Sequence, residues 1–195
     1  MKRAREQVCL GFDGSETDDF TVIRAETLDG FQFTPTFGPD STPTIWDPAQ
    51  HGGRIPRLDV HTAVEDLFSK YRVARFYCDP PKWQSEVESW ALKYGDDVVL
   101  PWETYRIKQM HEALERFVTD LATGALKHDA CPITARHVAN ARKVPKPGER
   151  YILSKPQGAY HQKIDAAVTS VLAHEAACDA RASGWKSRSS KMVVM

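Results

Sequence analysis

The sequence predicts an α/β fold in which a mixed β-sheet is flanked by helices. Short apolar segments typical of strands come first, and the first three lie close enough in the chain to form an antiparallel meander. Segments with apolar residues at helical spacing then alternate with further strands, the order that produces parallel strand pairs. These two observations together favour one mixed sheet covered by helices.

The meander begins with an apolar strand at residues 8–12. Residues 19–27 alternate polar and apolar side chains, which predicts a half-exposed second strand. Asp29-Gly30 is a hairpin turn signal, and residues 31–37 continue as a third strand. Residues 39–57 contain four prolines and two glycines, so we expect a loop there.

Helices and strands alternate in the rest of the chain. Helices are predicted at residues 61–71, 83–94, 104–123 and 132–142, and from Lys163 onward. Strands are predicted at residues 72–79, 97–102 and 151–155. The last helix is expected to have one inner face, formed by Ile164, Ala167, Val168, Val171 and Leu172. The connections would let strands 8–12 and 72–79 lie side by side and parallel.

The composition is that of a soluble globular protein. Hydrophobic residues make up 42% of the chain and charged residues 27%, and the apolar runs are too short to span a membrane. The N-terminus has no long apolar region, so no signal peptide is predicted. The four cysteines are widely spaced without a CxxC pair, which favours reduced thiols in a cytosolic protein.

The net charge of zero conceals an asymmetry. Residues 1–135 carry 15 Lys and Arg against 22 Asp and Glu, whereas residues 136–195 carry 11 against 4. Seven basic residues and one acid, Glu149, fall within residues 136–163. A basic segment of this kind suits a polyanion partner, and it also fits a solvated surface without a partner.

Three acids fall at the ends of elements. Asp13 ends the first strand, Asp79 ends the fourth, and Asp165 lies in the first turn of the last helix. If the two strands are neighbours, their acids approach each other, and clustered carboxylates raise one another's pKa unless a hard divalent cation neutralises them. Asp79 therefore has two interpretations: a metal ligand, or the N-cap of the helix that follows Pro80 and Pro81.

Four segments in order resemble the nuclease domain of tailed-phage large terminase subunits. They are GFDGSETDDFT, FYCDPPKW, LKHDACPITARHVANAR and YHQKIDAAVTSVLAHEA, and the resemblance covers about residues 8–177. It implies a ribonuclease H-like fold with a five-stranded mixed sheet, and a metal-dependent endonuclease that cuts concatemeric viral DNA during packaging. The family's three catalytic, metal-binding acids fall on Asp13, Asp79 and Asp165.

The resemblance further implies two divalent cations, Mg²⁺ or Mn²⁺, and two-metal phosphodiester hydrolysis in the cytoplasm of an infected bacterium. Asp13 is the candidate to bridge both ions. Implied partners are double-stranded DNA, a packaging ATPase domain, the portal and the small terminase subunit, with no membrane. No GxxxxGK[S/T] motif occurs. We therefore expect a nuclease domain over residues 1–182 without an ATPase domain, and a flexible tail over residues 183–195.

Basic residues around the third acid are predicted to bind DNA. Lys155, His161 and Lys163 flank Asp165 and are expected to face backbone phosphates, although a solvated turn has the same composition. Further contacts are predicted from the preceding basic segment, at Arg142, Lys143, Lys146 and Arg150.

Other candidates are weaker. Asp19 is a candidate for an additional acid, because a hairpin could bring it toward the site, but capping of its own turn is the simpler role. His128, Asp129, Cys131 and His137 match no common zinc module. Cys9 and Cys78 are expected to pack in the core, and Ser15 lacks the GxSxG context of a nucleophile.

Two other functions stay open. The acids also suit another ribonuclease H-like nuclease, such as a junction resolvase or an integrase-like enzyme. A non-catalytic nucleic-acid-binding module would keep the basic segment and lack metal-dependent cleavage.

Overall fold

A seven-stranded mixed sheet forms the centre of the computed structural model, which describes residues 5–185. Its strand order is β8-β7-β1-β2-β3-β9, with β6 paired to β2. The strands of this sheet are β1 (Gln7–Asp13), β2 (Thr21–Thr27), β3 (Phe31–Phe33), β6 (Ile45–Trp46), β7 (Arg72–Cys78), β8 (Val99–Pro101) and β9 (Lys127–His128). Strands β1, β2 and β3 form the expected antiparallel meander, and β7 joins β1 in parallel.

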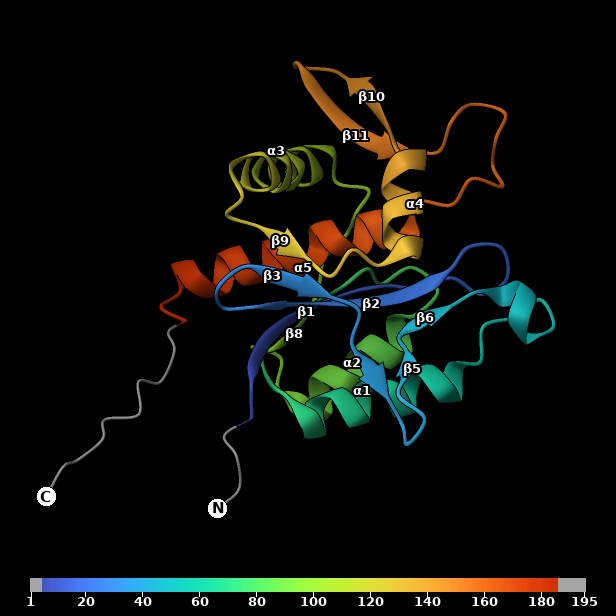
Figure 1. Cartoon of the computed structure of the whole chain (residues 1–195), viewed down its shortest axis with the longest axis vertical. Coiled ribbons are helices and arrows are strands. Elements are labelled where there is room, and N and C mark those ends of the chain that lie inside the picture. Colours follow the sequence, from blue (N-terminus) through green and yellow to red (C-terminus); the bar gives the residue numbers. More distant parts are fainter. Residues whose placement is uncertain (1–4, 186–195) are drawn as a thin grey trace, which may run out of the picture.

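Helices cover both faces of this sheet (Figure 1). Helices α1 and α2 lie on one face, and α3, α4 and α5 lie on the other. Their bounds are α1 (Arg57–Lys70), α2 (Gln84–Tyr94), α3 (Ile107–Thr123), α4 (Pro132–Asn140) and α5 (Asp165–Ala182). No helix in residues 5–185 is both long and apolar enough to cross a membrane.

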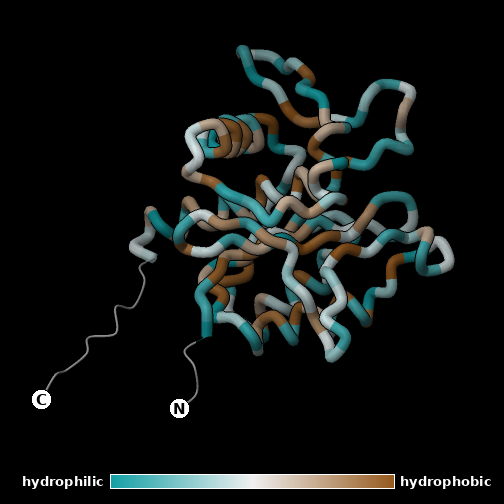
Figure 2. Tube along the Cα trace, viewed as in Figure 1, coloured by the Kyte–Doolittle hydropathy of each residue, from teal (hydrophilic) through white to brown (hydrophobic). Residues whose placement is uncertain are grey.

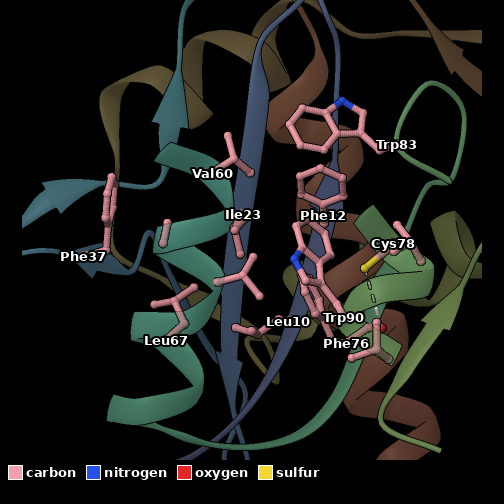
Figure 3. Close-up of a cluster of buried hydrophobic side chains, with 14 of the residues drawn as sticks. Leu10, Phe12, Ile23, Phe37, Val60, Leu67, Phe76, Cys78, Trp83 and Trp90 are labelled. Atoms are coloured by element: carbon pink, nitrogen blue, oxygen red, sulfur yellow. Dashed lines mark hydrogen bonds between the residues drawn. The ribbon is translucent and has the colours of Figure 1, made fainter. Parts of the chain in front are cut away.

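The alternation of side chains along β1 divides the core in two. Val8, Leu10 and Phe12 belong to the cluster beneath the sheet, where Phe12 meets Trp83 and Trp90 edge to face (Figure 3). Cys9 points the other way, into the cluster with α3 and α5. Because successive side chains alternate between faces, the carboxylate at the end of β1 falls on the α5 side.

Helix α5 lies directly against β1 at Gly11. A Cβ atom at Gly11 would come 2.5 Å from the backbone N of Ala173 and 2.6 Å from the carbonyl O of Thr169, so only glycine permits this approach. The expectation of one inner face on α5 is wrong, because residues 165–177 are buried on every side between the sheet, α3 and α4.

Two other expectations need correction. The second strand is fully buried rather than half-exposed, because helices cover both of its faces. The third strand is broken, with β3 ending at Phe33 and a short strand β4 (Thr36–Phe37) pairing with β5 (Thr42–Pro43). The predicted loop also contains β5, β6 and a 3₁₀ helix, η1 (Pro48–His51).

A β-hairpin stands apart from the sheet. Strands β10 (Arg142–Lys146) and β11 (Arg150–Ser154) pair antiparallel, where the sequence predicted one strand, at residues 151–155. Figure 2 shows that the tip of this hairpin is hydrophilic. The hairpin packs on α3 through β11 and leads into the start of α5.

The described chain ends in an ordered contact. Trp185, in the stretch expected to be flexible, packs on the hydrophobic cluster between the sheet, α3 and α5. Its Nε1 donates a hydrogen bond to Oε1 of Gln7 at 2.8 Å. Residues 186–195, the rest of the predicted tail, lie outside the described residues.

Candidate active site

A cleft of about 330 Å³ opens where β1 and β7 end and α5 begins. It is walled by the turn after β1, the segments after β7 and β8, the hairpin strand β11 and the first turn of α5. Four acids line it, namely Asp13, Asp19, Asp79 and Asp165. The three acids singled out in the sequence are therefore brought together in one cleft.

Strand pairing places the first two acids beside each other. Phe12 and Cys78 are partners in the parallel pair of β1 and β7, and the N–H of Asp79 donates to the carbonyl of Phe12 at 3.0 Å. Asp13 and Asp79 each follow one of these partners, and both turn toward the face that α5 covers.

The third acid reaches the cleft because α5 packs so closely on β1. Asp165 is the first residue of α5, and its Oδ2 accepts a hydrogen bond from the N–H of Phe20 at 3.3 Å. This bond ties the helix start to the chain segment that enters β2. Asp165 therefore lines the same cleft as Asp13, at the end of β1.

The Asp79 carboxylate is held by Thr104, not by a helix. Its Oδ2 accepts from the Thr104 hydroxyl at 2.7 Å, and its Oδ1 accepts from the Thr104 N–H at 3.3 Å. Helix α2 begins at Gln84, with Trp83 at its N-cap and no side-chain cap. The N-cap interpretation of Asp79 is therefore wrong.

Burial and the charges of neighbouring acids raise the pKa values of these carboxylates. Burial raises the pKa of Asp13 well above its usual value, and the charges of Asp165, Asp79 and Asp19 raise it further. Burial, with the charge of Asp19, raises the pKa of Asp165 to about 6. Burial also raises the pKa of Asp79, although the bonds from Thr104 oppose the shift.

Asp19 differs from the other three acids. Its carboxylate pairs with Lys155 and with Lys163, the latter at 2.8 Å. Although burial opposes them, these two ammonium groups lower the pKa of Asp19 overall. The expectation that Asp19 caps its turn is wrong, since it is the Ser15 hydroxyl that accepts a backbone bond there, from the Asp19 N–H at 3.2 Å.

The predicted DNA-binding residues fall into three places. Lys155 lines the acidic cleft, while Lys163 and the exposed His161 line a neighbouring cleft beside Phe20. The other four lie on the hairpin, at Arg142, Lys143, Lys146 and Arg150. The register pairs Lys146 with Arg150 across it.

The four residues considered for zinc each have another partner. Asp129 forms an ion pair with the buried Arg24 at 3.2 Å, and His128 accepts the Ala130 N–H at Nδ1. His137 is buried, and its Nδ1 accepts the N–H of Ala166 at 3.1 Å. Cys131 donates its N–H to Asp129. The expected core positions of Cys9 and Cys78 are confirmed, since both are fully buried.

Sequence patterns missed two residues of the cleft. Thr104 is separated from Asp79 by 25 positions, so no local pattern pointed to it. Lys82 lines the cleft with a left-handed backbone, φ 64°. The double proline before Lys82 was the one signal for an unusual turn there.

Hard divalent cations fit this donor set. Carboxylate oxygens are the ligands that Mg²⁺ and Mn²⁺ prefer, and burial together with the neighbouring carboxylates raises the pKa of Asp13. The two lysines in contact with the acids are both engaged with Asp19. Asp13, Asp79 and Asp165 are therefore the residues available to hold metal.

Two curated phage proteins are similar to this chain in sequence. The Gene 13 protein of Mycobacterium phage D29 is 32% identical over 184 residues, and that of Mycobacterium phage L5 is 30% identical over 200 residues. The matches cover 89% and 97% of this chain, but the chain spans only 30% and 32% of those proteins. No protein-family model matches the chain.

Solved structures of phage large terminases share this fold. The large terminase nuclease from thermophilic phage G20c has a TM-score of 0.63 at 13% identity, over 87% of this chain and 82% of its own. The same nuclease with bound magnesium has a TM-score of 0.62 at 12% identity, over 89% of this chain and 82% of its own. The HK97 bacteriophage large terminase has a TM-score of 0.66 at 14% identity, over 89% of this chain and 40% of its own. The ribonuclease H-like fold expected from the sequence is thereby confirmed. The sheet has two more strands than the five expected, because β6 and β9 add short pairs at β2 and β3.

Proposed function

Because the chain has the fold of phage large-terminase nuclease domains and is similar to the Gene 13 proteins of two mycobacteriophages, we propose that it is a metal-dependent DNA endonuclease of viral genome packaging. The observation that carries the proposal is the cleft in which Asp13, Asp79 and Asp165 converge. The proposal includes the expected partners: double-stranded DNA, a packaging ATPase domain, the portal and the small terminase subunit.

The three acids would hold two divalent cations, Mg²⁺ or Mn²⁺. Such ions would supply an activated water and charge neutralisation for the leaving oxygen of a phosphodiester. Asp13, at the end of the internal strand β1, would hold these ions together with Asp79 and Asp165. Thr104 would keep the Asp79 carboxylate in one rotamer through its two hydrogen bonds.

Basic residues on one side of the cleft would bind the DNA backbone. Lys155 and Lys163, which pair with Asp19 in the metal-free protein, would exchange that carboxylate for a backbone phosphate. Tyr160, 73% exposed in the segment between them, offers an aromatic face. The hairpin residues Lys146 and Arg150 would extend the contact along the duplex. A junction resolvase or an integrase-like enzyme would share the acids and differ in substrate.

A plasmid digestion tests the function. The full chain should nick and linearise supercoiled plasmid with Mg²⁺ or Mn²⁺, bind without turnover in Ca²⁺, and do nothing in EDTA. Preference for a four-way junction over plasmid would favour a resolvase. Cleavage that persists in EDTA would contradict the metal-dependent mechanism, and DNA binding without any cleavage would leave a binding module.

A further inference from the structure

A second group of potential metal ligands lies between α3 and α5, away from the acidic cleft. The Nε2 atom of His174 lies 3.0 Å from Oδ2 of Asp120 and 3.5 Å from Sγ of Cys178. All three ligand atoms lie within 4.8 Å of one another. Among the residues in the described range, no three acids of the cleft form so close a group.

The local structure explains how these side chains meet. His174 and Cys178 are one turn apart on α5, so they lie on the same side of the helix. Asp120 comes from the last turn of α3, which packs against α5. His174 is 2% exposed, whereas the side chain of Asp120 is 34% exposed, so the group is anchored in the core and open to solvent on one side.

The other nitrogen of His174 has a buried carboxylate partner. Nδ1 lies 2.9 Å from Oε2 of Glu26, a side chain with no exposed surface. Glu26 is held in turn by Gln32 at 3.1 Å and by Arg181 at 3.1 Å. A histidine that binds metal through one nitrogen commonly donates from the other to such a carboxylate. The arrangement therefore leaves Nε2 facing Asp120 and Cys178.

We propose that Asp120, His174 and Cys178 bind a borderline-soft divalent cation, of which Zn²⁺ is the best match. One nitrogen, one oxygen and one sulfur ligand form a set that Zn²⁺ accepts and Mg²⁺ does not, and a water can take the fourth position on the open side. On binding, the cation would displace the proton between His174 and Asp120 and the thiol proton of Cys178.

Charged side chains surround the group. Glu26 and Asp120 contact the two ring nitrogens of His174. The guanidinium of Arg116 pairs with Glu175, and that of Arg181 pairs with Glu26 while its Nη2 lies 3.4 Å from Sγ of Cys178. A cation bound between the three ligands would replace the contact that Arg181 makes with the thiol, and Arg181 would keep its pair with Glu26.

The proposed site is structural and independent of nuclease chemistry. His174 follows Asp165 by nine residues of helix, so it lies about 14 Å along α5 from the cleft. A bound ion would join α3 to α5, and through His174 and Glu26 to β2. It would fix the helix whose first residue enters the cleft.

Cobalt substitution tests the site. With Co²⁺, the full chain, freed of metal by chelation, should develop a thiolate-to-metal charge-transfer band, which reports this site because no cysteine lines the acidic cleft. Zn²⁺ should bleach that band and raise the Tm. Cys178→Ser should abolish the band, and Cys131→Ser should keep it, because Cys131 is also partly exposed but lies outside the group.

Asp120→Asn is a second test on the exposed side, where folding is least at risk. It should weaken Zn²⁺ binding by about tenfold or more. The thiolate-to-metal charge-transfer band should remain at saturating Co²⁺. Cys78 cannot produce the band from the acidic cleft, because its side chain is buried in the opposite core. Absence of the thiolate band with Co²⁺, or a band unchanged in Cys178→Ser, would overturn the proposal whatever the outcome of plasmid cleavage.

Discussion

The carboxylate of Asp79 accepts two hydrogen bonds from a single residue, Thr104, through its hydroxyl at 2.7 Å and its N–H at 3.3 Å. The two residues come from the ends of neighbouring strands, β7 and β8, which pair in parallel. This pairing fixes the rotamer of Asp79 before any metal binds.

Thr104→Val should therefore reduce cleavage while the fold persists. Valine removes the hydroxyl bond but keeps the shape, so Asp79 gains rotational freedom and plasmid cleavage should fall by about tenfold or more. Thr104→Ser is the matched control, because it keeps the hydroxyl and should retain most of the activity. Equal rates for valine and serine would show that the bond does not position Asp79.

Replacing each acid of the cleft by its amide should separate activity from stability. Asp13→Asn, Asp79→Asn and Asp165→Asn should each lose most plasmid cleavage, since a neutral amide is a poorer ligand. In EDTA, the Tm should stay constant or rise, because each change removes a repelling charge.

The metal response gives this experiment its control. Mn²⁺ should raise the Tm of the wild type through preferential binding to the folded state, and by less in each amide variant. Asp40→Asn, at an exposed position, should leave both cleavage and the Mn²⁺ response unchanged. Wild-type cleavage by Asp79→Asn would exclude a ligand role for that residue.

Removal of charge from the hairpin should change the salt dependence of DNA binding. Lys146→Gln with Arg150→Gln should lower the slope of log K against log salt by about two, if each residue contacts one phosphate. The matched control is Lys70→Gln with Lys93→Gln, which removes two charges from α1 and α2 on the opposite face. If the slope of log K against log salt falls equally in both double variants, the DNA does not bind along the hairpin.

His137 should make the metal-free protein less stable in acid. Burial, with the charge of Arg136, lowers the pKa of His137 from 6.5 to about 4. The unfolded chain therefore binds the proton first, so this contribution to stability is present above pH 6.5 and is lost as the pH falls toward 4. Protonation would also remove the acceptor that Nδ1 provides for the Ala166 N–H.

His137→Asn provides the comparison, because its amide oxygen can accept the same bond without titrating in this range. Asp165, with a pKa near 6, contributes in the opposite sense, so the informative quantity is the difference between variant and wild type. Urea unfolding in EDTA from pH 4 to 7 should show that difference shrinking as the pH falls. A constant difference would exclude His137 as the titrating group.

Local sequence patterns were sufficient to predict much of the fold. Alternation and turn signals gave the meander, and helical spacing gave the five helices within a few residues. The positions of Asp13 and Asp79 at strand ends were also visible, because a strand end and an acid are both local features. Parallel pairing of β1 with β7 followed from the connection between them.

Tertiary packing alone decided which side chains meet. Asp79 binds Thr104 rather than its own helix, and Asp19 binds Lys155, 136 positions away. The complete burial of β2 likewise depends on helices that come later in the chain. These outcomes escape a sequence pattern because periodicity reports which face of an element is apolar. Which element covers that face depends on tertiary packing. The close contact of α5 with Gly11 brings Asp165 to the same cleft as Asp13.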